Sequence, residues 1–538
     1  MDQHTIEPVA TPEVAKETPP SRELSKLFAM VTDRFVHPQA GPNHEHKITV
    51  NPFVSKMASA YEKLRNAMEY REEEVILRAT IERILRRRLL LGGTAKSTAE
   101  PLIRELIWAR YLADNEVPES AVVKIEEVID VYLALRLRIL DKHQMRVGEL
   151  NDLIYHLMSA AIEHVLNPNE EKQIMANFMY KVLLDDVEII EETEETRNAQ
   201  VYLAVRRAFA KDDHAFLQYH IFSLYFGELT KANLDHVVQN FPSGLKEINR
   251  QLVYPKRDRI FSYVKKRAAA FFVLEVLMRE NKDGLKALLS DEKKVEEKAQ
   301  EICNRQYRSI SSKVRRAIVR SVIFILMTKV LFAFAIEGTY ERLVYGGIQW
   351  TTLLINTSIP PLLMVVVSLF IRSPDQKNTN RIYAYIQALL YDESPRLGGR
   401  LQIHKNADKP NLAFNLLWLS AFVISFGAII SLLSALHFNI VSQAIFIFFV
   451  TVVSFLAYRI SLSAHDFSVG DKQDLLTPFI DFLFVPVIRV GRRLTQSISQ
   501  INFFLFLFDF IIETPFKLIF AFIEQWFKFL HEKTEDLG

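Results

Sequence analysis

The sequence predicts an all-α protein in which a large cytosolic helical domain is followed by a four-helix transmembrane bundle and by C-terminal amphipathic helices at the membrane interface. Three observations predict this class. Only 16 of the 538 residues are glycine, which disfavours folds rich in strands and glycine loops. Charged residues are dense up to about residue 310, and long apolar runs dominate after about residue 316. Several of these runs approach the ~20 residues that a helix needs to cross a bilayer.

The first part of the chain carries no export signal. Residues 1–22 contain four prolines, several acids and no apolar stretch, which predicts a disordered tail. A secretory signal needs a basic start and a continuous apolar core of roughly 7–15 residues, and neither is present. We therefore expect residues 23–310 to remain in the cytosol.

Residues 23–310 have a helical pattern nearly throughout. Within 71–91, apolar residues recur every three or four positions beside a ladder of alternating charges. The turn signal Asn167-Pro168-Asn169 suggests a subdomain break near 167–169. Residues 268–278 are strongly apolar but too few to cross a bilayer, so we expect a buried core helix there.

The composition argues against several kinds of functional site. The single cysteine, Cys303, excludes an intramolecular disulfide and any metal site built from several cysteines. A net charge of +2 gives no reason to expect nucleic-acid binding. No nucleotide loop, zinc motif or nucleophile set can be assembled from the spacing of the residues. The sequence therefore predicts no cofactor and no metal, and it leans against an enzyme.

Four apolar segments are predicted to cross the membrane, at 317–336, 353–371, 413–436 and 441–460. The first is interrupted by Arg320 and Lys329 and could instead lie along the membrane surface. Three spans would place the two chain ends on opposite sides of the membrane, however, so we favour four.

The charges of the connecting loops predict the orientation. The loop at 372–410 carries seven basic residues, whereas the loop at 337–352 carries only Arg342. Because basic loops stay in the cytosol, both termini are expected to be cytoplasmic, most simply in the plasma membrane. A short amphipathic stretch at 379–391 is expected to dock on the soluble domain or on the inner leaflet.

A basic cluster precedes the first predicted span. Its members are Arg308, Lys313, Arg315 and Arg316. A cation near an anionic leaflet contributes about 1 kcal/mol of attraction, so these residues are candidates for contact with lipid headgroups. Marking the cytosolic side of the membrane explains them equally well.

Lys329 lies close to the middle of the first predicted span. A charge at that depth costs at least ~2.5–3.5 kcal/mol unless it is compensated. The predicted partners are Asn356, Gln443 and Glu337, and the alternative is that the flexible lysine stem reaches outward to the interface. In the second span, Pro360-Pro361 is expected to kink or break the helix and free backbone carbonyls.

Small residues form a stripe on the third predicted span. Its members are Ser420, Gly427, Ser431 and Ser434. Such a stripe allows a neighbouring helix to approach closely, so we expect helix packing there, within the chain or between copies of it in an oligomer.

The C-terminal region at 475–530 is predicted to form interfacial amphipathic helices. Within 501–530, six polar residues follow one helical stripe and ten phenylalanines occupy much of the remainder. The segment is expected either to float in the inner interface or to turn its polar stripe to the cytosolic domain while its apolar face covers the bundle.

The sequence supports two functional hypotheses. The first is a membrane-anchored helical scaffold or adaptor that presents residues 23–310 to a cytosolic protein partner, with the lipid bilayer as its other partner. The alternative is a small transporter or channel with a polar route near Lys329 and the Pro360-Pro361 break. The two differ in whether Lys329 and its polar neighbours converge inside the bundle. A lipid-active enzyme at the inner interface has no support from residue spacing.

Overall fold

The computed structural model confirms the all-α class. It describes residues 46–68, 75–143, 145–281, 284–348, 350–369, 371, 374–404, 412–470, 477–499 and 514–535. The tail predicted at 1–22 lies outside the described residues. Helices dominate everywhere, and two four-residue strands make the one sheet among the described residues.

The helices and strands before residue 310 form what we call the helical region. It comprises α2 (Pro52–Met68), α3 (Ile76–Leu90), α4 (Ala95–Trp108), α5 (Ser120–His143), α6 (Val147–Leu166), α7 (Glu170–Leu184), β1 (Val187–Ile190), α8 (Glu194–Val205), the π-helix η2 (Arg206–Ala210), α9 (His214–Phe226), α10 (Leu234–Leu252), α11 (Arg257–Glu280), α12 (Leu285–Leu289) and the start of α13 (Glu292–Phe332).

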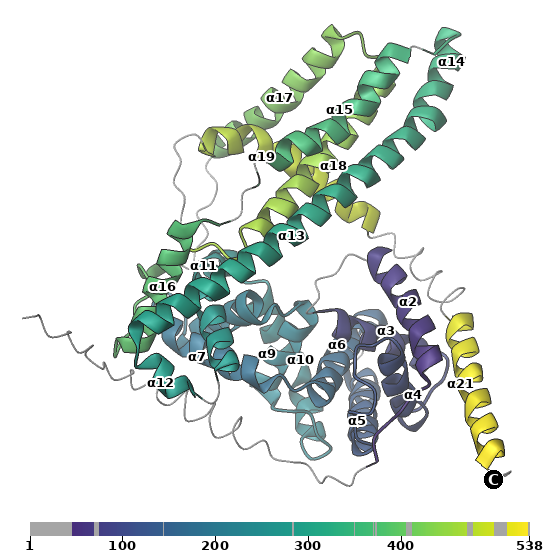
Figure 1. The fold of residues 1–538 in the computed structure, drawn as a ribbon, viewed down its shortest axis with the longest axis vertical. Helices are drawn as coiled ribbons and strands as arrows, with labels where there is room; N and C mark the ends of the chain where they lie inside the picture. Colours follow the sequence, from purple (N-terminus) through teal and green to yellow (C-terminus); the bar gives the residue numbers. More distant parts are fainter. Residues whose placement is uncertain are drawn as a thin grey trace, which may run out of the picture.

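The later elements form an apolar bundle and two appendages. The apolar bundle contains the end of α13, the π-helix η4 (Ala333–Gly338), α14 (Thr339–Tyr345), α15 (Trp350–Leu369), α17 (Leu412–Ala435), α18 (Ile440–Ala464) and α19 (Thr477–Ser499). The appendages are α16 (Gln376–Tyr391) with β2 (Leu401–His404), and α21 (Thr514–Glu535). Figure 1 shows the bundle projecting from one end of the helical region, with α21 beside α2.

Buried apolar side chains form two large cores among the described residues. The first lies among α2–α6, α9 and α10. The second begins at α7, includes α8 and α11, and continues along α13 into α15 and α18 of the apolar bundle. The turn at 167–169 lies between α6 and α7, which belong to different cores, and Asn169 caps α7 by accepting the Lys172 amide. The domain boundary proposed there stays a prediction.

Helix α13 joins the two parts without a linker. Asp291 caps its first turn by accepting the backbone amide of Lys294. The helix packs on α11 and α12 near its start and on α15 and α18 near its end. Because one unbroken helix belongs to both parts, the direction of the bundle is set by the helical region (Figure 1).

The loop between the second and third predicted spans folds back onto the helical region. Ile382, Ile386 and Leu389 of α16 are fully buried against the second core, which agrees with the first of the two placements expected for 379–391. Strand β2 then pairs in parallel with β1, from Val187 opposite Leu401 to Ile190 opposite His404. Neither strand was predicted, because a parallel pair of four residues has almost no local sequence signal.

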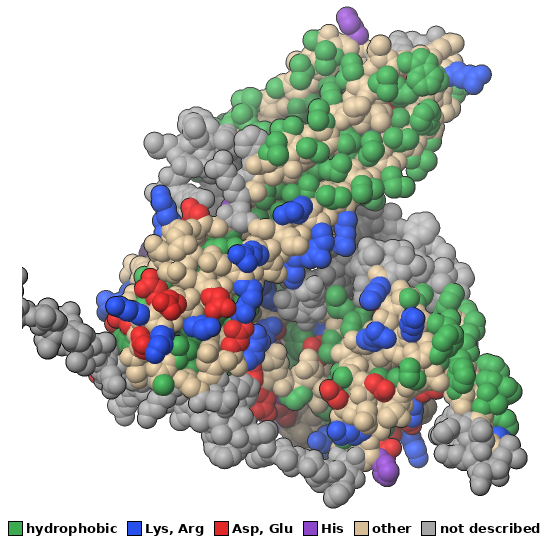
Figure 2. All heavy atoms as spheres, viewed as in Figure 1, with side chains coloured by type: hydrophobic (Ala, Val, Ile, Leu, Met, Phe, Trp, Pro, Cys, Tyr) green, Lys and Arg blue, Asp and Glu red, His purple; other side chains and the backbone are tan. Residues whose placement is uncertain are grey.

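Among the described residues, three helices are long and apolar enough to cross a membrane. They are Glu292–Val344, Leu412–Ala435 and Ile440–Ala464, and the helix at Leu353–Leu369 is apolar but shorter. Figure 2 shows apolar side chains over most of the visible face of the bundle. Membrane-span candidates are therefore present, whereas the count of four spans stays a prediction.

Helix α19 packs against α17 and α18 instead of standing apart from the bundle. A Cβ atom added to Gly491 would lie only 2.0 Å from the carbonyl oxygen of Thr451, so the backbones of α18 and α19 are in close contact. The hydroxyl of Ser425 on α17 also donates to the carbonyl of Leu483 on α19, at 2.7 Å. Gly491 and Ser425 thus allow close helix packing, which the sequence pattern predicted at the small-residue stripe of the third span.

Most of the stripe predicted for helix packing makes no close contact with another helix, although Ser434 at the end of α17 accepts a hydrogen bond from Gln443 of α18 at 3.2 Å. A Cβ atom added to Gly427 would meet no atom within 4 Å. Ser431 and Ser434 are exposed, and Ser420 donates to the carbonyl of Leu417 on its own helix. Packing through this stripe thus stays a prediction.

Candidate functional site

The candidate site is built around a π turn in the first predicted span. Lys329 and Glu337 are eight residues apart, which on a regular α-helix would place them about 80° apart around the axis. The π-helix η4 at Ala333–Gly338 inserts an extra residue into the helical path. The insertion brings Glu337 round to the face of Lys329, so the two side chains point into the same interior space.

Lys329 and Glu337 form a fully buried ion pair. The Nζ atom of Lys329 lies 2.6 Å from Oε1 of Glu337, and both side chains are 0% exposed. Asn356 of α15 donates its Nδ2 hydrogen to Oε2 of Glu337, also at 2.6 Å, and is itself buried. The lysine ammonium also lies 5.0 Å from the ring centroid of Phe449 on α18. The charge is compensated inside the bundle. The lysine stem therefore does not reach outward to the interface, which was the alternative.

Unused hydrogen-bonding capacity remains beside this pair. The Nδ2 of Asn356 approaches the carbonyl of Ser442 on α18 at 3.4 Å. The Oδ1 atom of Asn356 and the Oγ atom of Ser442 are buried without a hydrogen-bond partner among the described residues. Each such atom costs roughly 1–3 kcal/mol, and in native proteins such atoms concentrate where a structure has a role beyond packing.

A second buried carboxylate lies one turn further along. Glu341 of α14 is 0% exposed, and Asn439 donates to its Oε1 from 3.3 Å. Asn439 also caps α18 by accepting the amide of Ser442. The sequence analysis missed Glu341, Asn439 and Ser442 because it assigned the first two to polar turns. The four-residue spacing of Glu337 and Glu341 on one helical face was the available signal.

One sequence-based expectation about the neighbourhood is corrected, and another holds only in part. Gln443 does not join the cluster, because its Nε2 donates to Ser434 Oγ at 3.2 Å and to the Phe438 carbonyl at 2.9 Å, in the turn before α18. Pro360-Pro361 does not break α15, which continues through both prolines. The prolines lack the amide hydrogens that would bond the carbonyls of Asn356 and Thr357, so the helix loses bonds beside the cluster without ending.

The basic cluster on α13 divides between two faces. Arg308 and Arg315 line a shallow surface hollow of about 460 Å³ together with Tyr307 and Ser312, whereas Lys313 and Arg316 lie outside it. All four basic side chains are exposed. Figure 2 shows basic side chains between the apolar bundle and the rest of the molecule. Contact with lipid headgroups stays a prediction.

Helix α21 docks on the helical region through its polar stripe. Lys517 is buried between Glu62 and Glu105, with Nζ to carboxylate distances of 3.3 and 3.8 Å. Glu524 pairs with Arg104 at 3.1 Å and accepts the indole hydrogen of Trp108. We call this set of contacts the C-terminal clamp.

Glu105 is the centre of the C-terminal clamp. It is buried and accepts hydrogen bonds from Arg87 and Arg88 as well as facing Lys517. Burial alone would raise the pKa of this carboxyl, but Arg87, Lys517 and Arg88 together lower it from 4.5 to about 2. The carboxylate is therefore ionised throughout the neutral range and holds three cations, two from α3 and one from α21.

Much of the apolar face of α21 points away from both the helical region and the bundle. Phe520 is buried in the first core, but Leu518, Phe522 and Trp526 are 66%, 67% and 51% exposed. Figure 1 shows α21 beside α2 and away from the bundle, and Figure 2 shows its exposed apolar side chains. The expectation that this face covers the bundle is wrong. Residues 501–513 of the predicted stripe lie outside the described residues.

Comparisons with protein-family models, with curated proteins and with solved structures find no match to this chain. Among the described residues, no group of three or more histidine, cysteine or acidic side chains could hold a metal ion. The functional argument therefore depends on the geometry alone.

Proposed function

We propose that this chain is a multi-pass membrane scaffold that holds its helical region at the cytoplasmic face of a membrane and presents it to a cytosolic protein partner. The observation that carries this proposal is the rigid connection between the helical region and the apolar bundle. A shared core and the unbroken helix α13 join them, and the β1–β2 pair attaches the loop between α15 and α17 to the helical region. A platform needs such a connection, whereas a domain that is only tethered does not.

An ion-pair junction adds a further connection. Asp466 follows α18, and its two carboxylate oxygens lie 2.6 Å from the Nζ atoms of Lys211 and Lys265 in the helical region. Burial would raise the pKa of Asp466, but the two lysines lower it. The junction thus stays charged and paired at neutral pH, and it fixes the end of α18 against the helical region.

Cysteine labelling should report the proposed topology. In intact cells, Gly347→Cys, in the loop between α14 and α15, should react with a membrane-impermeant maleimide, because α15 is proposed to start outside. Ser394→Cys, in the loop after α16, should react only after lysis. Both positions are exposed, and the native Cys303 is buried, so background labelling should be low. Labelling of Ser394→Cys alone in intact cells would refute the orientation.

The exposed face of α21 is proposed to lie in the inner membrane interface. Its aromatic and aliphatic side chains suit that depth, and the C-terminal clamp holds the opposite face. A polarity-sensitive dye on Phe522→Cys should shift to the blue and brighten when the full-length protein is moved from detergent into vesicles containing anionic lipid. The same dye on Leu137→Cys should not respond, because that residue is similarly exposed but belongs to α5 and not to the apolar face of α21. Equal responses at both positions would contradict the placement.

Site-specific photo-crosslinking in native membranes tests the scaffold role itself. Leu224 and Val253 are 61% and 72% exposed on the helical region. A photoreactive residue at either position should yield one discrete adduct of constant mass, because a dedicated partner docks in one orientation. A diffuse smear or no adduct at both positions counts against a dedicated partner.

A transport role is the second candidate, and one observation favours it. Lys329, Glu337 and Asn356 converge in the interior of the bundle instead of facing lipid. Under this alternative, the double variant Lys329→Met with Glu337→Gln should abolish ion flux in proteoliposomes. Under the scaffold proposal, the same variant should keep the membrane insertion and the crosslinked adduct of the native protein.

A further inference from the structure

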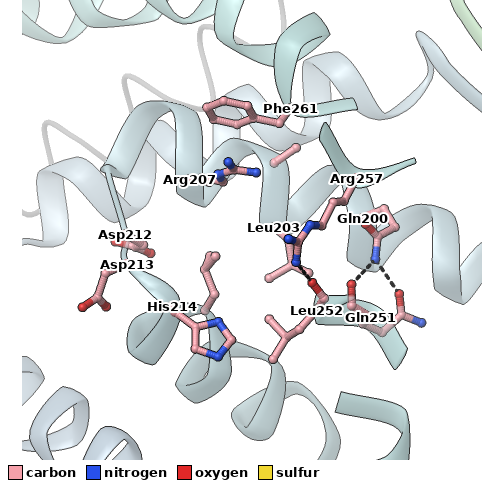
Figure 3. A pocket seen from close by; sticks show the side chains of 12 residues that line it. Gln200, Leu203, Arg207, Asp212, Asp213, His214, Gln251, Leu252, Arg257 and Phe261 are labelled. Atoms are coloured by element: carbon pink, nitrogen blue, oxygen red, sulfur yellow. Dashed lines mark hydrogen bonds between the residues drawn. The ribbon is translucent and has the colours of Figure 1, made fainter. Parts of the chain in front are cut away.

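A hollow of about 280 Å³ lies in the helical region, far along the chain from the ion pair in the bundle. It is enclosed by α8, η2, α9, α10 and the start of α11. Figure 3 shows Arg207 and Arg257 reaching its space from opposite sides, with His214 below them. These three side chains come from η2, α11 and α9, so the hollow depends on the tertiary fold.

The two acidic residues in the loop before α9 form ion pairs with side chains outside the hollow. Lys211 has a φ of 63°, which turns the chain sharply after η2. Asp212 then pairs with Arg206 at 2.6 Å and with His220 at 3.2 Å. Asp213 pairs with Arg78 at 2.6 Å and caps α9 by accepting the amide of Phe216. Both carboxylates at the edge of the hollow are therefore paired with arginines outside it.

Arg207 and Arg257 keep most of their hydrogen-bond donors available. Arg207 stacks over the ring of Phe261 at 4.0 Å and bonds the exposed Asp258 through Nη1 at 2.7 Å. Arg257 donates from Nη1 to the carbonyl of Leu252, and its nearest carboxylate, Asp258, is 4.0 Å from Nε. A guanidinium has five N–H donors, so each arginine can still bind an anion with two parallel hydrogen bonds.

The remaining wall of the hollow is mostly apolar. Leu203, Leu217 and Leu252 line it, and Gln200 is held by its bonds to Gln251, at 2.8 Å to both the backbone and the side-chain oxygen. A mostly apolar hollow with a few convergent polar groups is the usual arrangement of a small-molecule site, and two arginines among those groups suit a carboxylate or phosphate.

We propose that this hollow binds a small amphipathic anion, whose phosphate or carboxylate group is held by Arg207 and Arg257 and whose apolar part lies against Leu203 and Leu217. His214 provides a third polar contact from α9. The site is independent of the proposed scaffold role, and its occupant could bias that role only through α9 and α11.

Phenyl phosphate is a suitable probe because it joins one phosphate to one small apolar ring. Isothermal titration of the full-length protein in detergent should detect its binding, whereas phenol should not bind measurably, since it lacks the anion. Arg207→Gln and Arg257→Gln should each weaken binding about tenfold or more, the usual loss for one charged hydrogen-bonding group. Arg259→Gln is the matched control, because Arg259 is an exposed arginine of the same helix that does not line the hollow.

A second variant distinguishes a lost binding site from misfolding of an arginine variant. Leu217→Trp keeps both cations but fills the hollow, so it should also abolish binding while the thermal midpoint without ligand stays near the native value. Inorganic phosphate and dihexanoyl phosphatidic acid, added separately, distinguish a free phosphate from a lipid headgroup as the source of the anion. The proposal is overturned if phenyl phosphate fails to bind the native protein, or if it binds the variants Arg257→Gln and Leu217→Trp as tightly as the native protein.

Discussion

Lys329→Met is expected to destabilise the folded protein by about 3–5 kcal/mol, the usual cost of removing one partner from a buried ion pair. The variant would leave Glu337 and its partner Asn356 in the apolar interior without a compensating cation. Unfolding in mixed detergent, followed by circular dichroism, measures the change in the free energy of unfolding.

The double variant Lys329→Met with Glu337→Gln should recover most of the lost stability, because an uncharged glutamine leaves no buried charge. Arg320→Met serves as the matched control, since Arg320 is an exposed cation on the same helix and its loss should change stability little. If Lys329→Met unfolds like the native protein, the lysine must reach outward to the interface instead of pairing with Glu337.

Glu105→Gln is expected to destabilise the helical region and release α21, with a loss of about 3 kcal/mol at neutral pH. The substitution leaves Arg87, Arg88 and Lys517 close together without their shared carboxylate. Equilibrium unfolding measures the loss, and the dye on Phe522→Cys reports whether α21 has detached. Glu100→Gln is the control, because Glu100 is half exposed in a surface pair with Arg104. Its loss should lower the free energy of unfolding by less than about 1 kcal/mol.

The Glu105 carboxyl also predicts how the stability of the protein depends on pH. Its pKa is lowered on folding, from 4.5 to about 2, so its stabilising effect is fully present above pH 4.5 and is lost as the pH falls towards 2. The shift corresponds to about 3 kcal/mol. Native protein should therefore lose more stability than Glu105→Gln over this acid range, and parallel curves for the two proteins would contradict the assignment.

The bundle site could be predicted in part because its chemistry is local. A lysine in the middle of an apolar span requires compensation, and that requirement pointed to Glu337 and Asn356 among three candidates. The third, Gln443, is occupied by the turn before α18. The π turn that aligns Lys329 with Glu337 has no sequence signal of its own, since η4 differs from an α-helix only in one inserted residue.

The contacts of α21 could likewise be predicted only in part. Its polar stripe follows from residue spacing, because residues three and four apart share one face of a helix. The surface that receives the stripe does not follow from spacing. Glu62 and Glu105 are over four hundred residues away from Lys517, and only the packing of α2 and α4 brings them together.

The class of fold, the apolar segments and the amphipathic character of α21 are properties of the local sequence. They reflect helical periodicity and the partition of side chains between water and an apolar phase, and both act over a few turns of chain. The bond from Asn356 to Glu337, the β1–β2 pair, the close contact at Gly491 and the hollow at Arg257 arise only when separate elements meet. Such contacts depend on the mutual fit of whole elements, which no stretch of sequence encodes alone.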